Sequence, residues 1–251
     1  MSQNMQLENF VQGNDYCFFD RNEIKQFSSE MLDSSYWQEQ NAITGSAQGR
    51  GTTWFVQYCE SNNNQEKHWV LRHYYRGGLI GKLINDSYFF TSQKNTRAAK
   101  EFTLLALMQE LTLPAPKPIA YRVTRHGLFY RADLLSSRVE NAQDLVAILT
   151  KQWITDDLWF AIGETIKRFH QQGIYHHDLN AHNILIDNNN KPWLIDFDQG
   201  ELRTIQQGWQ QSNIQRLLRS FRKEKDKLSN FNWSESNWQT LLGGYNSNSI
   251  N

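Results

Sequence analysis

Two polar motifs joined by a predicted hairpin limit the folds open to this chain. The first motif, residues 176–183, reads H-x-D-L-x-x-x-N, and the second, residues 194–198, reads L-I-D-F-D. The stretch that joins them predicts two short apolar strands with a polar, asparagine-rich turn at residues 187–192. Such a hairpin would return Asp196 to the side of Asp178, so that both carboxylates belong to one site.

These residue types in this order suit the transfer of a phosphoryl group. That reaction needs a carboxylate to accept the proton of the attacking hydroxyl, and Asp178 has this position in the first motif. It also needs oxygen ligands for the magnesium ions that neutralise the phosphates, and the side chains of Asn183 and Asp196 could be these ligands. An ordinary loop and turn is the alternative, but two motifs that agree in order and spacing favour a phosphotransferase that uses ATP and Mg²⁺.

The chain divides by pattern into three parts. Residues 1–40 are polar and mixed, and they predict an N-terminal extension with modest structure. Residues 41–134 are rich in predicted strands and predict a nucleotide-covering lobe, whereas residues 135–251 hold both motifs and predict mainly helices. Together these parts predict an α+β, bilobal, protein-kinase-like fold with a strand-rich N-lobe and a reduced helical C-lobe.

Hydrophobic periodicity and chain breakers locate the main elements. Strands are expected at residues 54–56, 68–75, 119–123 and 128–134. Helices are expected at residues 96–110, 158–172 and 209–227, with Gly173 as the C-cap of the second one.

A glycine-rich turn precedes the first of these strands. Gly49 and Gly51 would let the backbone approach the phosphates of ATP closely. The order G-x-x-x-G-x-G over residues 45–51 departs from the usual G-x-G-x-x-G, and an ordinary turn is the alternative.

A cation should reach the same phosphates from the next strand. Arg72 ends the run V-L-R, where protein kinases carry the Lys of V-A-I-K, and Arg can make the same charge-assisted contact. Lys82 is the rival candidate for this cation. Glu101, on the following predicted helix, is expected to hold the cation in place, and a surface ion pair is the alternative for it.

The composition excludes several classes of protein. The chain has 26 Lys and Arg against 26 Asp and Glu, so no net charge favours nucleic acid as a partner. Cys17 and Cys59 lack the spacing of a metal or redox motif and suit a reducing compartment. No apolar run reaches the roughly 18 residues of a membrane span. We therefore expect a cytosolic protein, or one held against a membrane from the cytosolic side.

The motifs resemble those of the lipopolysaccharide kinases that act on 3-deoxy-D-manno-octulosonic acid (Kdo), a family with a protein-kinase-like fold. The resemblance runs from about residue 45 to about residue 221. It is carried by residues 71–82, 175–186 and 193–198, with support from residues 49–54 and 209–220.

This resemblance implies an ATP- and Mg²⁺-dependent transfer to the 4-hydroxyl of Kdo in the inner core of lipopolysaccharide, with Kdo-lipid A as the acceptor. The protein would act at the cytoplasmic side of the bacterial inner membrane as a peripheral membrane protein. The resemblance makes Asp178 the catalytic base and Asn183 and Asp196 the magnesium ligands. It also carries over Arg72 as the phosphate-binding cation and Glu101 as its partner.

The predicted helix at residues 209–227 offers basic side chains to an anionic partner. Leu217, Leu218 and Phe221 add an apolar component, and a basic amphipathic helix can lie on an anionic membrane surface. A solvated helix face is the alternative. No A-P-E motif follows Asp196, so a protein substrate is not expected.

Three other functions fit parts of the sequence. A small-molecule kinase of the aminoglycoside or choline type shares the H-x-D loop, and a heptose kinase would act on the same glycolipid core. A pseudokinase would bind nucleotide without turnover, although the intact Asp178, Asn183 and Asp196 argue against it. His176 is expected to brace the loop, and the role of Asp198, in place of the glycine of D-F-G, stays open.

Overall fold

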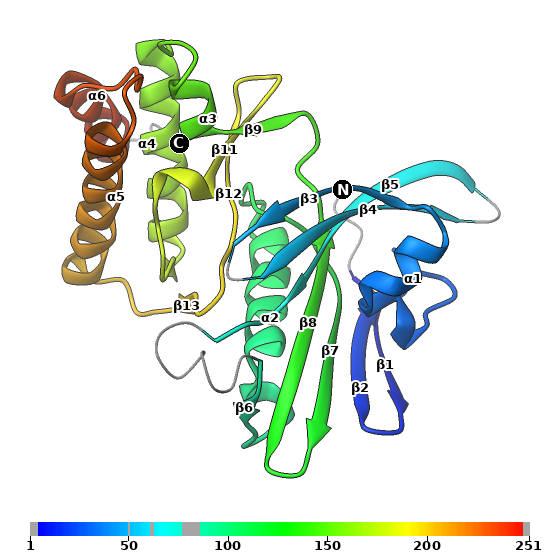
Figure 1. The fold of residues 1–251 in the computed structure, drawn as a ribbon. Coiled ribbons are helices and arrows are strands. Elements are labelled where there is room, and N and C mark those ends of the chain that lie inside the picture. Colours follow the sequence, from blue (N-terminus) through cyan, green and yellow to red (C-terminus); the bar gives the residue numbers. More distant parts are fainter. Residues whose placement is uncertain (1–4, 50, 61–62, 77–85, 248–251) are drawn as a thin grey trace. The chain divides into compact units, whose positions relative to one another are not determined.

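Residues 5–49, 51–60, 63–76 and 86–247 are described by this computed structural model (Figure 1). The chain divides into two units, each with its own core. The first unit comprises Met1–Glu110 and Pro116–Arg138, and the second comprises Leu111–Ala115 and Val139–Asn251.

The described residues of the first unit form an eight-stranded antiparallel sheet with a long helix, α2. The strand order is β1-β2-β7-β8-β5-β4-β3, and β6 pairs with β8. The strands are β1 (Leu7–Gln12), β2 (Asp15–Asp20), β3 (Ile43–Gln48), β4 (Thr52–Glu60), β5 (Asn63–His73), β6 (Tyr88–Phe89), β7 (Pro118–His126) and β8 (Phe129–Ser137). The helices are η1 (Ser29–Leu32), α1 (Ser34–Glu39), η3 (Gln93–Asn95) and α2 (Arg97–Glu110).

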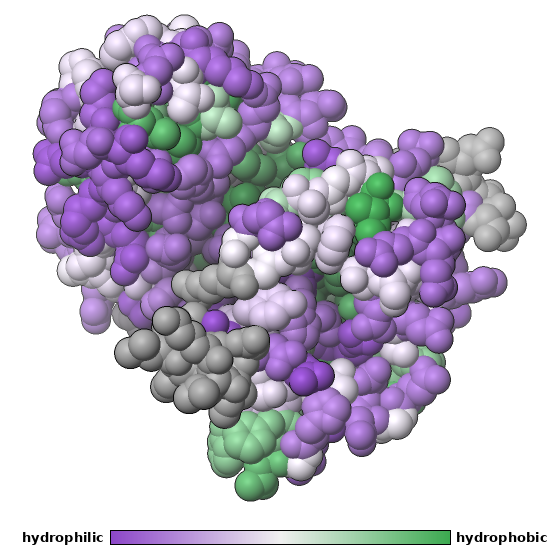
Figure 2. Space-filling model, viewed as in Figure 1, coloured by the Kyte–Doolittle hydropathy of each residue, from purple (hydrophilic) through white to green (hydrophobic). Residues whose placement is uncertain are grey.

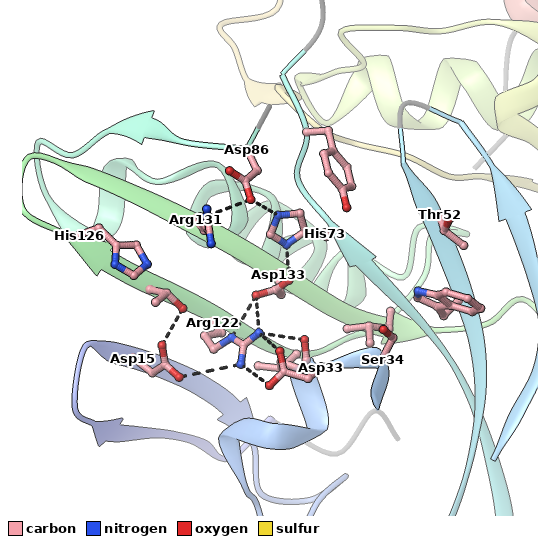
Figure 3. A pocket seen from close by; sticks show the side chains of 15 residues that line it. Asp15, Asp33, Ser34, Thr52, His73, Asp86, Arg122, His126, Arg131 and Asp133 are labelled. Carbon is pink, nitrogen blue, oxygen red and sulfur yellow. Dashed lines mark hydrogen bonds and ion pairs between the residues drawn. The ribbon is translucent and has the colours of Figure 1, made fainter. Parts of the chain in front are cut away.

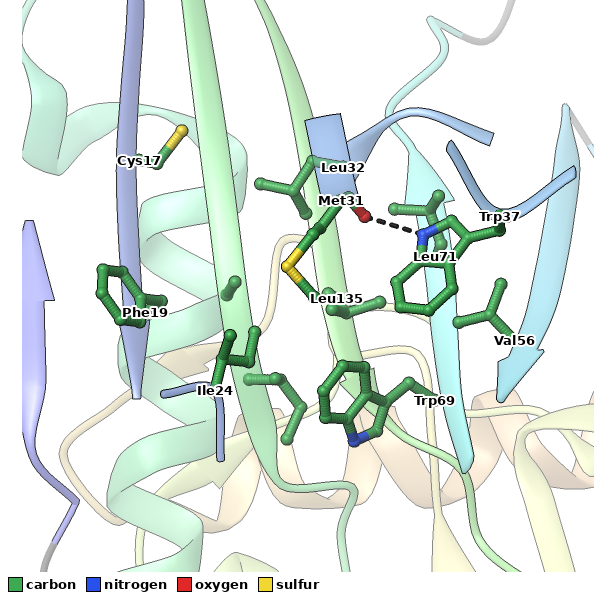
Figure 4. Packing of buried hydrophobic residues seen from close by; sticks show 12 residues of the cluster. Cys17, Phe19, Ile24, Met31, Leu32, Trp37, Val56, Trp69, Leu71 and Leu135 are labelled. Atoms are coloured by element: carbon green, nitrogen blue, oxygen red, sulfur yellow. Dashed lines mark hydrogen bonds between the residues drawn. The ribbon is translucent and has the colours of Figure 1, made fainter. Parts of the chain in front are cut away.

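The two faces of this sheet are covered by different elements. On one face Phe102 of α2 packs against Phe18 and Tyr121, with ring centroids 5.9 and 5.2 Å apart. Because successive strand residues point to opposite faces, the other face presents a second apolar set, which η1 and α1 cover (Figure 4). In that set Trp37 donates from Nε1 to the carbonyl of Met31 at 2.8 Å. Parts of both faces of the sheet are therefore covered by helices.

The first 40 residues contribute more regular structure than the sequence predicts. Strands β1 and β2 extend the sheet beside β7, where Phe18 pairs with Tyr121. Ile24, Met31 and Trp37 are almost fully buried. The expectation of an N-terminal extension with modest structure is therefore wrong. Two short strands and two helices of fewer than two turns show too little hydrophobic periodicity to be recognised in the sequence.

A buried arginine ties this N-terminal segment to the sheet. Arg122 on β7 donates to the carbonyl oxygens of Ser29 and Leu32 and to both carboxylate oxygens of Asp33. It also donates from Nε to Asp133 on β8 at 3.0 Å. Carboxylates thus offset the charge of a guanidinium that would otherwise be costly to bury.

The second unit combines helices with two small sheets. Its helices are α3 (Leu145–Leu149), α4 (Asp156–Gln171), η4 (Ala181–Asn183), α5 (Gln207–Lys227) and α6 (Glu235–Asn246). Its strands are β9 (Ala142–Asp144), β10 (Ile174–Tyr175), β11 (Ile184–Asp187), β12 (Pro192–Leu194) and β13 (Glu201–Leu202), in the orders β12-β11-β9 and β10-β13. The predicted α+β class, strand-rich first and helix-rich second, is confirmed.

Helix α4 shows why the sequence located the long helices well. Thr155 caps its start by accepting from the backbone N–H of Leu158, and two acidic residues follow in the first turn. The helix ends before Gly173, whose φ of 72° is the left-handed conformation that glycine adopts without strain. Local signals therefore mark both ends of the element that leads into the first motif.

The apolar side of α5 is buried inside the second unit. Leu217 and Phe221 are fully buried, and Phe221 stacks on Trp233 with ring centroids 5.7 Å apart. The idea that this side could rest on a membrane is wrong, because the unit's own core occupies it. The basic side chains of Arg219 and Lys223 remain exposed.

Most apolar side chains lie in the two cores, and the visible surface is largely hydrophilic (Figure 2). An apolar patch covers the turn of the β7–β8 hairpin, where Leu128 and Phe129 are exposed and Phe89 lies 6.2 Å from the Phe129 ring. Within the described ranges, no helix has both the length and the apolar character to cross a bilayer.

Candidate active site

The two polar motifs lie side by side in the second unit. Strands β11 and β12 pair in the register Ile184 to Leu194, as the predicted hairpin requires. Beyond the last pair, the N–H of Ile195 donates to the carbonyl of Asn183 at 3.0 Å. The end of the first motif is therefore hydrogen-bonded to the residue that precedes Asp196.

His176 connects the two motifs a second time. Its Nδ1 accepts from the backbone N–H of Asp178 at 3.2 Å, and its Nε2 lies 2.9 Å from the carbonyl oxygen of Ile195. A ring nitrogen that accepts leaves the proton on the other one, so Nε2 donates to Ile195. Burial lowers the pKa of His176, which keeps this neutral tautomer. The expectation that His176 braces the loop agrees with these contacts.

Asn180 and Asn183 hold the loop around Asp178. Asn180 caps η4, since its Oδ1 accepts from the N–H groups of His182 and Asn183. Its Nδ2 donates to the carbonyl oxygen of Asp178 at 3.0 Å and to Oδ2 of the same residue at 3.2 Å. Asn183 donates from Nδ2 to that carbonyl at 2.9 Å, so its side-chain oxygen is the end that points elsewhere.

Asp196 has an unusual backbone conformation. Its φ of 61° lies in the left-handed region, which costs a non-glycine residue on the order of 1–3 kcal/mol and is found most often at functional sites. The next residue, Phe197, is fully buried and stacks on Phe169 with ring centroids 5.6 Å apart. The buried ring anchors the segment, so the conformation of Asp196 is fixed from its C-terminal side.

Asn183 and Asp196 have the donor atoms that a hard divalent cation prefers. Mg²⁺ is bound by few protein oxygens and completes its shell with phosphates and water, so one amide oxygen and one carboxylate suit it. In the described part of the chain, no three His, Cys, Asp or Glu residues gather as a metal site.

Three side chains on one face of helix α5 form hydrogen bonds with the first motif. Asn213 donates from Nδ2 to the carbonyl of His176 at 2.7 Å, and Ser220 accepts from the N–H of Ala181 at 2.9 Å. Between them Arg216 places Nη1 at 3.3 Å from Oδ1 of Asp178. These three contacts were not predicted from the sequence, although residues 213, 216 and 220 are spaced to share one face of the predicted helix.

Asn213 itself is oriented by residues of two other helices. His170 on α4 lies with Nε2 3.2 Å from Oδ1 of Asn213 and with Nδ1 2.7 Å from the hydroxyl of Tyr245 on α6. Since Oδ1 of Asn213 can only accept, His170 donates from Nε2 and accepts from Tyr245 at Nδ1. Burial lowers the pKa of His170 to about 4, so the ring stays neutral and keeps this polarity.

The predicted cation and its carboxylate partner meet in the first unit. Arg72 on β5 donates from Nη2 to Oε2 of Glu101 on α2, and the two side chains are 22% and 3% exposed. Tyr74, two residues after Arg72 and directly after the end of β5, donates to the same oxygen at 2.6 Å. Burial raises the pKa of Tyr74 far above its ordinary value, which keeps the hydroxyl a donor. Sequence reasoning missed Tyr74, although a residue two positions after Arg72 points to the same side of an extended chain.

The glycine-rich turn lies between β3 and β4. Gly49 donates from its N–H to the carbonyl of Gly51 at 3.0 Å. A Cβ on Gly51 would lie 2.0 Å from the ring of Tyr75, so this backbone passes directly against an aromatic face. Lys82, the rival to Arg72, lies outside the described residues.

A polar cavity of about 590 Å³ opens on the sheet face opposite Arg72 (Figure 3). His73 lies there with Nδ1 2.6 Å from Asp133 and Nε2 3.3 Å from Asp86, and Asp86 also pairs with Arg131 at 2.9 Å. Burial works against a charge on His73, but its bonds to Asp133 and the charges of both carboxylates raise its pKa. Asp133 also accepts from Arg122, and His73 alternates with Arg72 along β5, so His73 points away from the Arg72–Glu101 pair.

Comparisons with known proteins agree with this arrangement. The model of the lipopolysaccharide kinase (Kdo/WaaP) family matches residues 34–245. The 3-deoxy-D-manno-octulosonic acid kinase of Photobacterium profundum is 44% identical over 95% of this chain and 98% of its own length. The enzymes of the same name from Vibrio vulnificus and Haemophilus influenzae are 48% and 41% identical, over 86% and 95% of this chain and 89% and 99% of their own lengths.

Proposed function

This chain belongs to the lipopolysaccharide kinase (Kdo/WaaP) family, and from that membership we propose that it transfers the γ-phosphate of ATP to the 4-hydroxyl of Kdo on Kdo-lipid A. The three relatives compared above are named 3-deoxy-D-manno-octulosonic acid kinase. Their similarity to this chain covers most of its length and most of their own. The chain is thus a phosphotransferase, and the acceptor and its hydroxyl are the proposal.

In the proposed reaction Asp178 is the general base. The acceptor hydroxyl gives its proton to the Asp178 carboxylate as its oxygen bonds to the γ-phosphorus, and the bond from that phosphorus to the β,γ-bridging oxygen breaks to release ADP. Asn183 and Asp196 would hold Mg²⁺, which when bound neutralises charge on the phosphates. The observation that carries the assignment is the double connection of the two motifs through His176 and Asn183.

The first unit would bind the nucleotide phosphates. Arg72 supplies the cation, and Glu101 with Tyr74 fixes its direction from inside the unit. Gly49 and Gly51 would let the β3–β4 turn lie close to the phosphates. Lys82 stays the alternative to Arg72 for the charge.

Contact with the anionic inner-membrane surface rests on charge alone. Exposed basic side chains on α5, among them Arg219 and Lys223, are attracted to anionic lipid, each by about 1 kcal/mol near a bilayer. A peripheral position at the cytoplasmic side of the membrane would bring the protein to its lipid acceptor.

The position of the new phosphate tests the proposal. The protein is incubated with ATP, Mg²⁺ and Kdo-lipid A, and the product is examined by phosphorus–proton correlation NMR. Phosphate on O4 of Kdo, absent when Mg²⁺ is chelated, is the expected result. Phosphate on another hydroxyl would overturn the assigned position, and transfer only to a heptose-bearing acceptor would overturn the assigned sugar.

A further inference from the structure

Arg216 stands beside the group proposed as the base. Its Nη1 lies 3.3 Å from Oδ1 of Asp178, and the side chains of the two residues are 44% and 52% exposed. Both therefore reach solvent, where an incoming acceptor would meet them. An exposed ion pair of this kind contributes little to stability, so stability does not account for the position of Arg216.

The framework around Arg216 is fixed on both sides. One turn before it, the buried Asn213 bonds the carbonyl of His176, and one turn after it, Ser220 bonds the N–H of Ala181. Helix α5 and residues 176–183, here called the catalytic loop, cannot shift against each other without breaking one of these bonds. The backbone positions of Arg216 and Asp178 are therefore held relative to each other, as a binding site requires.

The hydrogen-bonding capacity of the pair is only partly used. A guanidinium has five N–H donors, and Asp178 is the one hydrogen-bond partner of the Arg216 side chain among the described residues. The other oxygen of Asp178, Oδ2, accepts from Asn180 at 3.2 Å. The guanidinium of Arg216 therefore has further N–H donors available for a ligand. They lie next to the Asp178 carboxylate, which in the proposed reaction accepts one proton.

We propose that Arg216 binds the carboxylate of an acidic sugar acceptor and so selects it over a neutral sugar. The inference rests on the proposed function and deepens it, since Kdo is a sugar acid. In Kdo one ring carbon separates the carbon that bears the carboxylate from the carbon that bears the 4-hydroxyl. A hydroxyl seated at Asp178 therefore brings the carboxylate within reach of the neighbouring guanidinium.

Charge explains why an arginine is needed at this place. Two carboxylates a few ångströms apart repel each other, so an acidic acceptor would be driven away from Asp178 acting alone. Arg216 offsets the charge of Asp178 and offers the planar fork that matches a carboxylate with two parallel bonds. A neutral sugar would gain neither contact, so the arrangement distinguishes the two classes of acceptor.

A cycle of enzyme and acceptor changes tests this. Wild type and Arg216→Gln are each assayed with Kdo-lipid A and with the same lipid whose Kdo carboxylate has been converted to the neutral amide. With wild type, the amide should lower kcat/KM by about 10- to 100-fold, the range for a hydrogen-bonded charge. Arg216→Gln should lose a similar factor on the acid but little on the amide, with the KM for ATP unchanged, and Arg216→Lys should recover part of the loss.

Matched controls separate this role from a general effect of charge. Arg219→Gln removes the same charge one turn along α5 from an exposed side chain, and it should leave the ratio between acid and amide as in wild type. If Arg216→Gln loses the same factor on both acceptors, the inference is wrong while the proposed function stands. If wild type phosphorylates neither acceptor, the proposed function fails, and the inference falls with it.

Discussion

Asn213 on α5 donates a hydrogen bond of 2.7 Å from its side-chain amide to the backbone carbonyl of His176. The bond is the last of three that run from Tyr245 through His170 to the catalytic loop, and the donors and acceptors agree in direction along the whole chain. Residues far from the reacting groups therefore hold the loop that presents Asp178. Such buried networks give rigidity only when every member is satisfied.

Replacing Asn213 with Ala should lower kcat more than it changes the KM for ATP. The variant removes the donor to the His176 carbonyl and the acceptor of the His170 Nε2–H, while His170 keeps Tyr245 at Nδ1. An unpaired buried polar group costs about 1–3 kcal/mol. Steady-state kinetics with varied ATP checks the split, and Gln211→Ala, an exposed change on the same helix, is the control. Equal kinetic constants for wild type and Asn213→Ala would show that the loop keeps its position without this bond.

Replacing Arg72 with Ala should weaken the use of ATP. The change removes the cation assigned to the phosphates and leaves the nearly buried Glu101 without that partner. We expect a higher KM for ATP, and the KM for the acceptor lipid, which does not meet Arg72 in this account, should change less. An unaltered KM and kcat would transfer the phosphate-binding role to Lys82.

His170 should make the second unit sensitive to acid. Its pKa falls from 6.5 to about 4 on folding because the ring is buried. Between these pH values His170 is protonated in the unfolded chain and neutral in the folded one. Between these two values, stability should fall by up to about 1.4 kcal/mol for each unit by which the pH drops. Urea unfolding of wild type and His170→Gln at pH 7.5 and 5 measures this. Curves that shift equally with pH in both proteins would contradict it.

Gly51 should tolerate no side chain while Tyr75 is present. A Cβ at Gly51 would overlap the Tyr75 ring at 2.0 Å, whereas the nearest atom to a Cβ at Gly49 is 3.8 Å away. Gly51→Ala should therefore cost about 1–3 kcal/mol of unfolding free energy, as overpacking does, and Gly49→Ala should cost less. In a Tyr75→Ala background the penalty at Gly51 should vanish. A penalty that persists there would mean that the turn itself, and not the ring, requires glycine.

The sequence predicted those parts of the molecule that local signals specify. The catalytic hairpin follows from alternating apolar residues around an asparagine-rich turn, and α4 from a cap, a period and Gly173. The pairing of Arg72 with Glu101 could also be anticipated, because each residue sits on a well-marked element. These predictions needed neither long-range packing nor a distant partner.

What the sequence did not reveal depends on contacts between distant segments. Arg122 bonds the backbone of Leu32, and Arg216 reaches Asp178, across long stretches of chain whose meeting no local pattern encodes. The sequence correctly predicted that α5 is amphipathic. Its apolar residue Phe221, however, is covered by Trp233 and not by a membrane. Periodicity tells which side of a helix is apolar and leaves open what buries it.

The most direct test of the central claim is the transfer of labelled γ-phosphate from ATP to lipid. Wild type and Asp178→Ala are assayed with Kdo-lipid A and with lipid A that lacks Kdo. We expect that wild type labels only the Kdo-bearing lipid and that Asp178→Ala loses about 10²- to 10⁴-fold in rate while it still binds ATP. Equal labelling of the lipid without Kdo, or a rate near that of wild type in Asp178→Ala, would contradict the assigned acceptor or the assigned base.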